Sequence, residues 1–451
     1  MKYCKPRYSQ CNGVFVFLGT MDQIIKKLYR HYLESPGIST DTRKITSNCL
    51  FFALKGDNFD GNKYALQAIE KGAKLAVIDN PQLACDERFF LVENVLLTLQ
   101  SLAQYHRSKL KIPIIGITGS NGKTTTKELM GGVLEKKYKT FFTRGNLNNH
   151  IGVPLSILSI NEATEIAIIE MGANHPGEIA DLCQIAKPDF GIITNIGKAH
   201  LEGFGDFQGV VKTKNELYES LKLNQGKVFV NADDPLLMEL SKKLIRYSYG
   251  TNTTSGIQGS VLEKDPFLTL QLILKSGERI VKTQLIGDYN LPNILAAARV
   301  GQYFDVDDEL ICRALEEFAP ENMRSQYLKT NKNSLILDAY NANPTSMTLA
   351  IENFAELNSN HKMVILGDML ELGKDSPGEH KRIIALVQKS NFGKVVLVGK
   401  EFLLADTEDL FSHFIHVDKA IAHLSKENIC DYMILIKGSR GIQLEKLVEV
   451  F

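Results

Sequence analysis

Residues 116–125, GITGSNGKTT, concentrate groups that can bind a phosphate chain. An apolar run at 112–118 precedes this turn and a helical pattern opens near Thr124, so the turn is predicted to join a buried strand to a helix. Glycines let backbone N–H groups approach phosphate oxygens, and a helix N-terminus adds positive potential. We therefore predict that Lys123 neutralises the outer phosphates and that Thr124 binds Mg²⁺. The cradle itself is predicted to comprise Gly119, Ser120, Asn121, Gly122 and Thr125.

The spacing of this turn departs from the common GxxxxGKT pattern. Ile117 stands five residues before Gly122, and the glycines fall instead at 116 and 119. An ordinary glycine-rich turn is the alternative interpretation. The Lys-Thr pair between a predicted strand and a predicted helix favours a variant nucleotide-binding loop.

Three further residues downstream could serve the same site. Glu170 ends the apolar run 165–170, where a second carboxylate could hold Mg²⁺, although strand ends are commonly polar for no chemical reason. His200 follows the next predicted strand, at the sheet edge where open α/β sheets bind ligands. Lys214 lies on a helical pattern that, by itself, is typical of a solvated face.

The elements that must position these residues alternate between strand and helix patterns. Short strands are predicted at 50–54, 75–78, 89–92, 112–118, 165–169, 190–193 and 227–230, and again at 335–337, 363–366, 394–398 and 432–436. This alternation predicts an α/β protein with mostly parallel sheets. We expect three domains: a small α/β unit at 21–95, a central nucleotide-binding α/β domain at 96–322 and a Rossmann-like domain at 323–451. A hinge is expected at 317–324, around Pro320.

Composition restricts the class of protein. The chain has 451 residues with 52 Lys plus Arg against 52 Asp plus Glu, so no global charge excess attracts nucleic acid. No apolar run approaches the ~20 residues that span a bilayer. Seven scattered cysteines without a CxxC pair favour a reducing cytoplasm. Residues 1–20 fit no element, whereas Met21 opens an amphipathic helix, so we hypothesise that translation begins at Met21.

Five motifs occur in one order and together resemble the Mur ligases of peptidoglycan precursor synthesis, over about residues 39–441. They are the glycine-rich loop, Glu170-Met171-Gly172, residues 195–200, NADDP at 231–235 and GDYNLPN at 287–293. In the third domain, LDAYNANP at 337–344, LGDMLELG at 366–373 and IKGSR at 436–440 resemble the branch that adds D-alanyl-D-alanine. The Asp-Asn-Pro-Arg signature of the diaminopimelate- or lysine-adding branch is missing from this domain.

This resemblance implies ATP-driven amide formation, in which a substrate carboxylate takes the γ-phosphoryl group and an amine then attacks the acyl phosphate. It implies two Mg²⁺ ions, one at Thr124 and Glu170 and the other at His200 and a carbamylated Lys214. It also places Asn290 and Asn293 at the adenine, and Arg324 and Asp338 at the triphosphate and ribose. Lys123, Glu170, His200 and Lys214 are the implied catalytic residues.

The resemblance further implies two substrates, UDP-N-acetylmuramoyl-tripeptide and D-alanyl-D-alanine. The UDP end would meet Thr40, Asp41, Arg43, Phe59 and Asp60, although many relatives have a histidine where this chain has Asn62. Asn146 and Asn149 fall in a loop near the reacting carboxylate, and Asn341 lies in the third domain. We expect a monomer that neither binds nucleic acid nor inserts into a membrane.

Two other functions remain open from the sequence. Another Mur ligase or a folylpolyglutamate synthetase would share the phosphate loop and the carbamylated lysine but use a different acceptor, although relatives of the folate enzyme lack a UDP-binding unit. A nucleotide-dependent switch would not need all three of the candidate metal-binding residues Glu170, His200 and Lys214. The third residue of the tripeptide, diaminopimelate or lysine, is not encoded in any recognisable pattern.

Overall fold

The computed structural model describes residues 20–252 and 256–451, and these form two compact units. The first unit comprises residues up to 112 together with 143–162 and 184–187, and the second comprises 113–142, 163–183 and 188–451. The hypothesis about translation start concerns residues that lie mostly outside the described part. Among the described residues, no helix is long and apolar enough to cross a membrane.

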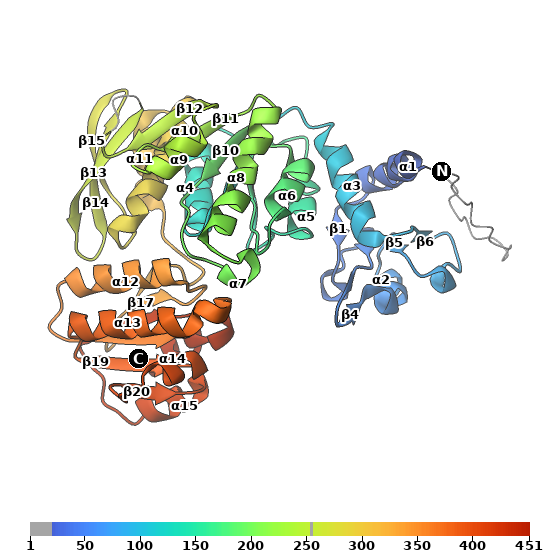
Figure 1. The fold of residues 1–451 in the computed structure, drawn as a ribbon. Helices are drawn as coiled ribbons and strands as arrows, with labels where there is room; N and C mark the ends of the chain where they lie inside the picture. The colour runs from blue at the N-terminus through green and yellow to red at the C-terminus, as the bar shows by residue number, and fades with distance from the viewer. Residues whose placement is uncertain (1–19, 253–255) are drawn as a thin grey trace. The chain divides into compact units, whose positions relative to one another are not determined.

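The first unit is built on a four-stranded parallel sheet in the order β1-β2-β5-β6 (Figure 1). Its strands are Ile38–Ser39, Leu50–Phe52, Leu75–Ile78 and Phe89–Leu91, and a short hairpin is formed by β3 (Lys55–Gly56) and β4 (Phe59–Asp60). Its helices are α1 (Met21–Leu33), α2 (Ala65–Glu70), α3 (Val95–Arg107) and α5 (Gly152–Ile157). The predicted amphipathic helix at Met21 is confirmed, since Ile25, Leu28 and Tyr32 form its buried face.

The second unit contains a nine-stranded sheet in the order β15-β14-β13-β12-β11-β10-β7-β9-β8. Strands β7 to β12 are Ile114–Thr118, Thr140–Phe142, Ile166–Glu170, Phe190–Ile193, Lys227–Asn231 and Ile245–Gly250, and they pair in parallel. Strands β13 (Ile257–Lys264), β14 (Leu268–Leu274) and β15 (Gly277–Lys282) extend one edge as antiparallel neighbours. The strand patterns of the sequence did not predict these three strands.

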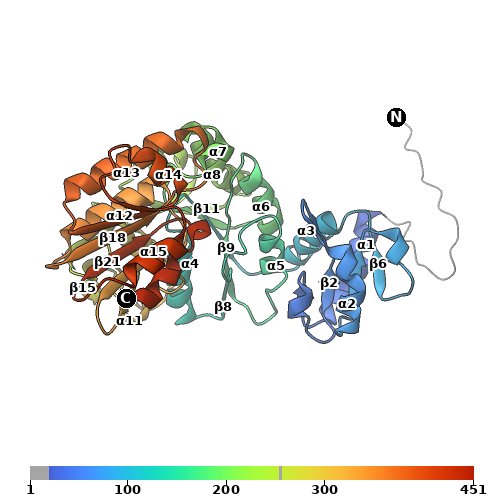
Figure 2. The same cartoon turned by 90° about the horizontal axis from the view of Figure 1, so that it is seen from below.

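Helices cover both faces of this sheet (Figure 2). One face packs against α4 (Lys123–Glu135), α10 (Leu291–Tyr303) and α11 (Asp308–Glu317), around the buried Ile115, Ile117 and Met130. The other face carries α8 (Phe207–Leu223), whose Leu217 and Leu221 press against Gly191. The remaining helices are α6 (Glu178–Ala186), α7 (Leu201–Phe204) and α9 (Pro235–Leu240).

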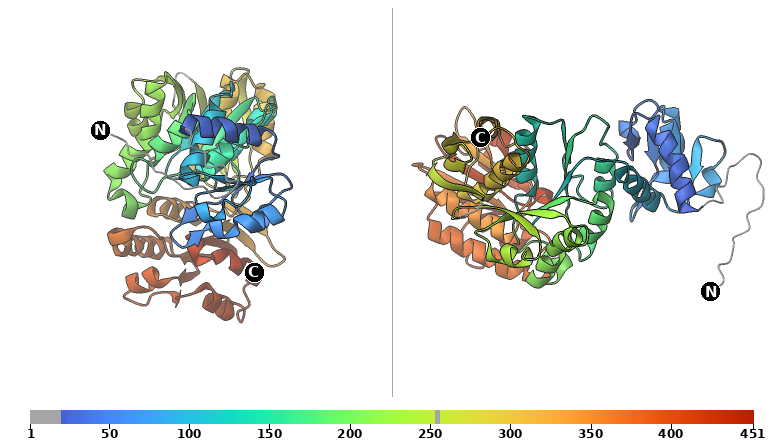
Figure 3. Two further views of the ribbon diagram at one scale, coloured as in Figure 1. Left: turned by 90° about the vertical axis from the view of Figure 1, so that its right-hand side faces the viewer. Right: turned by 90° about the horizontal axis from the view of Figure 1, so that it is seen from above.

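A six-stranded sheet completes the second unit, in the order β16-β17-β21-β18-β19-β20. These strands are Gln326–Lys329, Ser334–Asp338, Met433–Lys437, Lys362–Gly367, Lys394–Val398 and Ser412–Phe414, and only β16 is antiparallel to its neighbour. Helices α12 (Pro344–Glu356) and α13 (Ser376–Ser390), with α14 (Lys400–Ala405), cover one face, while α15 (Val417–Leu424) lies on the other (Figure 3). The predicted α/β class with mostly parallel sheets is confirmed.

Domain boundaries remain a prediction. The predicted hinge at 317–324 falls between the end of α11 at Glu317 and the start of β16 at Gln326, where the chain passes from the nine-stranded to the six-stranded sheet. Helix α3, which we placed in the central domain, lies in the first unit and packs against α5 there.

Candidate active site

The predicted phosphate loop connects β7 to α4. Gly119 and Gly122 have φ angles of 144° and 78°, in the region that side chains rarely adopt. The Ser120 N–H donates to the Asn195 carbonyl at 3.0 Å, and the Asn121 N–H donates to the Asn195 side-chain oxygen at 3.0 Å. Asn195, in the segment that follows β10, therefore holds two neighbouring residues of the loop, and the loop leads directly into the N-terminus of α4.

Replacing Gly119 with alanine is expected to disrupt this loop. A Cβ there would lie 2.0 Å from the Thr194 hydroxyl oxygen, and the φ angle would be strained by about 1–3 kcal/mol. We expect thermal unfolding at lower temperature and weakened ADP binding by calorimetry. Gly132→Ala on the same α4 helix is the control, since its Cβ meets no atom within 4 Å and should stabilise the helix by ~0.5–1 kcal/mol. Equal stability of both variants would contradict this account.

Lys123, the first residue of α4, folds back over the loop. Its ammonium donates to the Gly119 and Ser120 carbonyls at 2.6 and 3.2 Å. Burial lowers the pKa of Lys123 to about 8, with Glu170 opposing and the Arg324 guanidinium adding to the shift. The Lys123 ammonium, whose charge the nearby groups only partly balance, is therefore suited to bind anionic phosphate oxygens.

Glu170 lies at the carboxyl end of β9, almost wholly buried beneath the loop. Its Oε2 accepts from the Thr124 hydroxyl at 3.0 Å and lies 3.4 Å from the Lys127 ammonium, which is also buried. The structure thus brings the two residues predicted for the first metal ion into contact. Lys127, which the sequence analysis missed, supplies the counter-charge that a buried carboxylate requires.

His200 adopts a left-handed conformation, with φ 51°, immediately before α7. Its Nδ1 lies against the carboxylate of Glu371, which belongs to the loop after β18. The neighbouring imidazole lowers the pKa of Glu371. Glu371 lies in the LGDMLELG motif, but nothing in the sequence pairs it with His200.

Lys214 is buried in α8 with about 1% of its surface exposed, so it does not lie on the solvated face that its local pattern suggested. Its ammonium lies 5.4 Å from the centre of the Phe204 ring. Burial, with a contribution from Lys123, lowers the pKa of Lys214 to about 7, although Glu178 and Glu216 oppose the shift. A substantial share of this side chain is therefore a neutral amine near pH 7.

The predicted adenine contacts lie at the start of α10, beside the phosphate loop. The Asn293 side-chain oxygen accepts from Thr126 Oγ1 at 3.0 Å, and its NH₂ group donates to Asn290 at 2.9 Å. Asn290 in turn donates to the Ile286 carbonyl at 2.8 Å. A Cβ on Gly122 would lie 2.7 Å from the Asn293 oxygen, so a glycine is needed where α10 approaches the loop.

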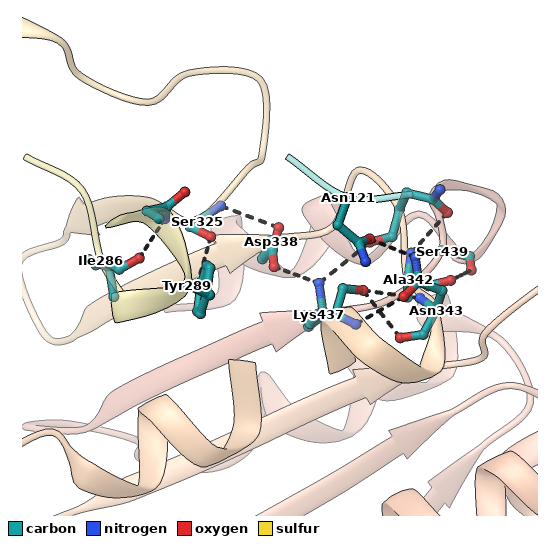
Figure 4. Close-up of polar contacts among 12 residues, drawn as sticks. Asn121, Ile286, Tyr289, Ser325, Asp338, Ala342, Asn343, Lys437 and Ser439 are labelled. Atoms are coloured by element: carbon teal, nitrogen blue, oxygen red, sulfur yellow. Dashed lines mark hydrogen bonds and ion pairs between the residues drawn. The ribbon is translucent and has the colours of Figure 1, made fainter. Parts of the chain in front are cut away.

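The six-stranded sheet brings its own predicted residues to the same loop (Figure 4). Asp338 ends β17 and pairs with Lys437 at 2.5 Å, and it accepts from the Ser325 N–H at 3.3 Å. The Asn343 NH₂ group donates to the Asn121 side-chain oxygen at 2.7 Å, which joins this sheet directly to the phosphate loop. Neither Asn343 nor Lys437 was assigned a role from the sequence.

Two further predicted residues, Arg324 and Asn341, precede and follow Asp338 in the sequence. The Arg324 guanidinium stacks 3.8 Å from the Tyr340 ring centre, and its buried Nε has no hydrogen-bond partner among the described residues. Its charge also reaches the phosphate loop, since it lowers the pKa of Lys123. The Asn341 side-chain oxygen accepts from the Ala342 N–H at 2.9 Å.

Residues predicted for the UDP end lie in the first unit. Asp41 accepts from the backbone and guanidinium of Arg43, whose side chain is 86% exposed, and this pairing lowers the pKa of Asp41 to about 2. Phe59 stacks on Tyr64 with ring centres 5.4 Å apart and is half exposed, so an aromatic face is accessible. Thr40 directly precedes Asp41 in the sequence.

Asn62 is buried and bonded to two carboxylates. Its NH₂ group donates to Asp60 at 2.9 Å and to Asp79 at 2.8 Å. It therefore ties Asp60, at the end of β4, to Asp79, which directly follows β5, and this is a structural role. Two other predicted substrate residues of this unit, Asn146 and Asn149, lie before α5, and the Asn149 side-chain oxygen accepts from the Gly152 N–H at 2.9 Å.

The oxygen atoms of Thr124 and Glu170 fit a magnesium site. Thr124 and Glu170 provide a hydroxyl and a carboxylate in direct contact, and such oxygen donors are the ligands that Mg²⁺ prefers. Among the described residues, no cluster of three or more His, Cys, Asp or Glu side chains could hold a metal by itself. A site here must therefore use hydroxyl groups, nucleotide phosphates or a modified side chain as additional ligands.

Comparisons with known proteins cover nearly the whole chain. Models of the Mur ligase family catalytic domain, the Mur ligase middle domain and the Mur ligase glutamate ligase domain match residues 35–107, 117–301 and 323–440. UDP-N-acetylmuramoyl-tripeptide–D-alanyl-D-alanine ligase of Bacillus subtilis is 37% identical over 92% of each chain, and its Escherichia coli counterpart is 33% identical over 91% of this chain and 92% of its own.

Solved structures show the same likeness. MurF from Acinetobacter baumannii has a TM-score of 0.83 and 31% identity, covering 95% of this chain and 97% of its own. MurF ligase from Thermotoga maritima, solved in complex with ADP, has a TM-score of 0.82 and 27% identity, covering 93% and 97%. A Mycobacterium tuberculosis folylpolyglutamate synthase shares the fold, with a TM-score of 0.60 at 15% identity. The chain belongs to the Mur ligase family.

Proposed function

We propose that the protein is an ATP-dependent amide ligase that adds D-alanyl-D-alanine to UDP-N-acetylmuramoyl-tripeptide during peptidoglycan precursor synthesis. The observation that carries this proposal is the end-to-end likeness to ligases of that name, at 37% identity over 92% of both lengths. The folylpolyglutamate alternative has only a shared fold in its favour. A monomer with a cytoplasmic location belongs to the same proposal, because ATP and UDP-linked precursors are cytoplasmic substrates.

The phosphate loop and its neighbours can perform the phosphoryl transfer. ATP lies with its phosphates on the loop at 119–125 and its adenine near Asn290 and Asn293. Lys123 and Arg324 provide positive charge from two sheets, which screens the approach of the substrate carboxylate to the γ-phosphate. Attack by the carboxylate gives an acyl phosphate and ADP, and attack by the dipeptide amine then releases phosphate and forms the amide.

Mg²⁺, when bound, stabilises the charge on the phosphate oxygens in both steps. The residues that would hold one ion are Thr124 and Glu170, whose side chains already touch. The residues that would hold a second ion are His200 and Lys214. An ammonium cannot bind a cation, so the second set fits only if Lys214 carries a negative charge.

Carbamylation would give Lys214 that charge. The neutral amine attacks CO₂, forming a C–N bond and releasing a proton, and the product is a carbamate anion. Burial supports this chemistry, because it lowers the pKa of Lys214 to about 7 and so leaves a substantial share of the amine neutral near pH 7. The nearby Phe204 ring and the surrounding protein also limit access of water to the modified group.

The first unit binds the UDP end of the tripeptide substrate in this proposal. Phe59 is expected to stack on uracil, and Arg43 is expected to contact the diphosphate. Phe59→Ala should raise KM for the UDP substrate about tenfold with little change in kcat, since stacking is worth ~1–3 kcal/mol. Initial rates at varied substrate concentration measure this.

Leu66→Ala is the matched control, because Leu66 is another exposed apolar residue of the same unit. Its KM should remain that of the wild type. An unchanged KM in Phe59→Ala would contradict the uracil assignment.

Coupling of ATP hydrolysis to both substrates tests the proposed function. Purified protein with ATP and Mg²⁺ should release phosphate rapidly only when UDP-N-acetylmuramoyl-tripeptide and D-alanyl-D-alanine are both present. Phosphate release that is independent of the amine would favour the alternative of a nucleotide-dependent switch. Release stimulated by a single amino acid and a shorter precursor would favour another Mur ligase.

A further inference from the structure

The loop between β18 and α13 carries a carboxylate that the proposed chemistry does not use. Residues 368–372 follow the carboxyl end of β18, and Glu371 is the member of this loop that lies against His200. The His200 side chain is 20% exposed and that of Glu371 is 52% exposed. His200 follows β10 of the nine-stranded sheet and Glu371 follows β18 of the six-stranded sheet, 171 positions later in the sequence, so their contact is a product of the tertiary fold.

The backbone holds this contact in place independently of the two side chains. The Glu202 N–H donates to the Glu371 carbonyl at 3.3 Å, so the loop is bonded to the first turn of α7. A Cβ on Gly373 would lie 3.3 Å from the Glu202 Cβ, which shows how closely the chains approach. His200 and Glu371 both have left-handed φ angles, 51° and 63°, in a region that non-glycine residues adopt only when their surroundings fix them.

We propose that Glu371 is a positioning residue that orients the His200 imidazole for metal binding. This inference rests on the proposed function, which assigns His200 to the second ion. The Glu371 carboxylate lies against Nδ1, and a negative charge at this place favours the tautomer that carries its proton on Nδ1 and leaves Nε2 with its lone pair. Metal-binding histidines commonly use their second nitrogen in this way.

The origin of Glu371 in the six-stranded sheet has a further consequence. The two proposed ligands of the second metal ion, His200 and Lys214, belong to segments beside the nine-stranded sheet. The residue that orients His200, Glu371, belongs instead to a loop of the six-stranded sheet. Docking of the 368–372 loop onto α7 therefore strengthens metal binding, and metal binding strengthens docking by the same factor. An ordinary exposed ion pair would contribute ~0–1 kcal/mol to stability and nothing to metal affinity.

Mn²⁺ binding in the presence of ADP, counted by electron paramagnetic resonance, tests this inference. Wild-type protein should bind a second ion, and Glu371→Gln should weaken that ion about 10–100-fold while leaving the other unchanged. Steady-state kinetics should show a raised KM for Mg²⁺, with kcat recovering at high Mg²⁺. Glu202→Gln removes an equal charge from the adjacent exposed position and should bind both ions like the wild type.

A double-variant cycle separates orientation from general damage. In a His200→Ala background, Glu371→Gln should have no further effect on Mn²⁺ affinity, whereas additive losses would overturn the inference. Glu371→Asp guards against misfolding, since it keeps the carboxylate and should recover part of the affinity. Unchanged Mn²⁺ binding in Glu371→Gln would also overturn the inference.

The inference and the proposed function can fail separately. Wild-type protein that makes the amide but binds a single ion would overturn the role of Glu371 and leave the ligase activity standing. Loss of the second ion in Glu371→Gln, in a protein that forms no amide from D-alanyl-D-alanine, would support the positioning role and overturn the acceptor assignment.

Discussion

Lys214→Met is expected to lower kcat by about 10³-fold or more, since loss of a metal ligand removes several kcal/mol of transition-state stabilisation. Methionine fills the buried volume beside Phe204 without a charge, so the fold should be retained. Added bicarbonate should not restore activity, because the variant has no amine to carbamylate. Lys214→Ala should be equally inactive. Steady-state rates and intact mass, with its gain of one CO₂ in the wild type alone, measure the effect.

Lys212→Met provides the control on the same helix, since Lys212 is exposed two residues before Lys214. Its kcat and its bicarbonate dependence should match those of the wild type. Full activity in Lys214→Met, with a normal thermal transition, would end the proposal that Lys214 is modified and takes part in the reaction.

Lys123→Met is expected to lower kcat by about 10²–10³-fold, the usual effect of losing one preorganised positive group at a developing charge. The loop should remain folded, because Ser120 and Asn121 stay bonded to Asn195. ADP should therefore still bind, although more weakly, since the lysine ammonium meets the outer phosphates. Single-turnover formation of ADP would locate the loss in phosphoryl transfer, and calorimetry would measure nucleotide affinity.

Lys136→Met tests whether any lost cation on α4 has this effect. Lys136 lies just beyond the end of that helix and makes an exposed pair with Glu317 at 2.5 Å. Its rates should be unchanged, with at most a small loss of stability. A kcat for Lys123→Met that equals the Lys136→Met value would contradict the phosphate-loop assignment.

Much of the fold follows from local patterns. Apolar runs bounded by Gly, Asp or Asn predict β7, β10 and β19 almost to the residue, because parallel strands buried on both faces must be continuously apolar. The antiparallel extension β13–β15 went unpredicted. Only β14 alternates regularly, while β13 loses the alternation in its second half and β15 buries a single residue, so the partners of these strands are defined by the sheet edge that they join.

The candidate site also contains some residues that local sequence patterns predict and others that only the tertiary structure brings together. Residues 119–125 and Glu170 can be identified from the sequence, because the spacing of the loop residues and the position of Glu170 at the end of a strand already indicate phosphate and metal binding. Lys214 is not, since its burial depends on packing beneath α7, and helical periodicity alone describes it as a surface lysine. Contacts made across the two sheets, Asn121 with Asn343 and His200 with Glu371, are set by tertiary structure, so no single-segment pattern contains them.

The product of the reaction tests the central claim most directly. Protein would be incubated with ATP, Mg²⁺, UDP-N-acetylmuramoyl-tripeptide and a panel of amines that includes D-alanyl-D-alanine, D-alanine and L-alanyl-L-alanine, and products would be identified by mass. The account predicts one product, heavier than the tripeptide substrate by D-alanyl-D-alanine less water, together with stoichiometric ADP and phosphate. A product formed only with a single amino acid, or ADP formed without any new amide, would contradict it.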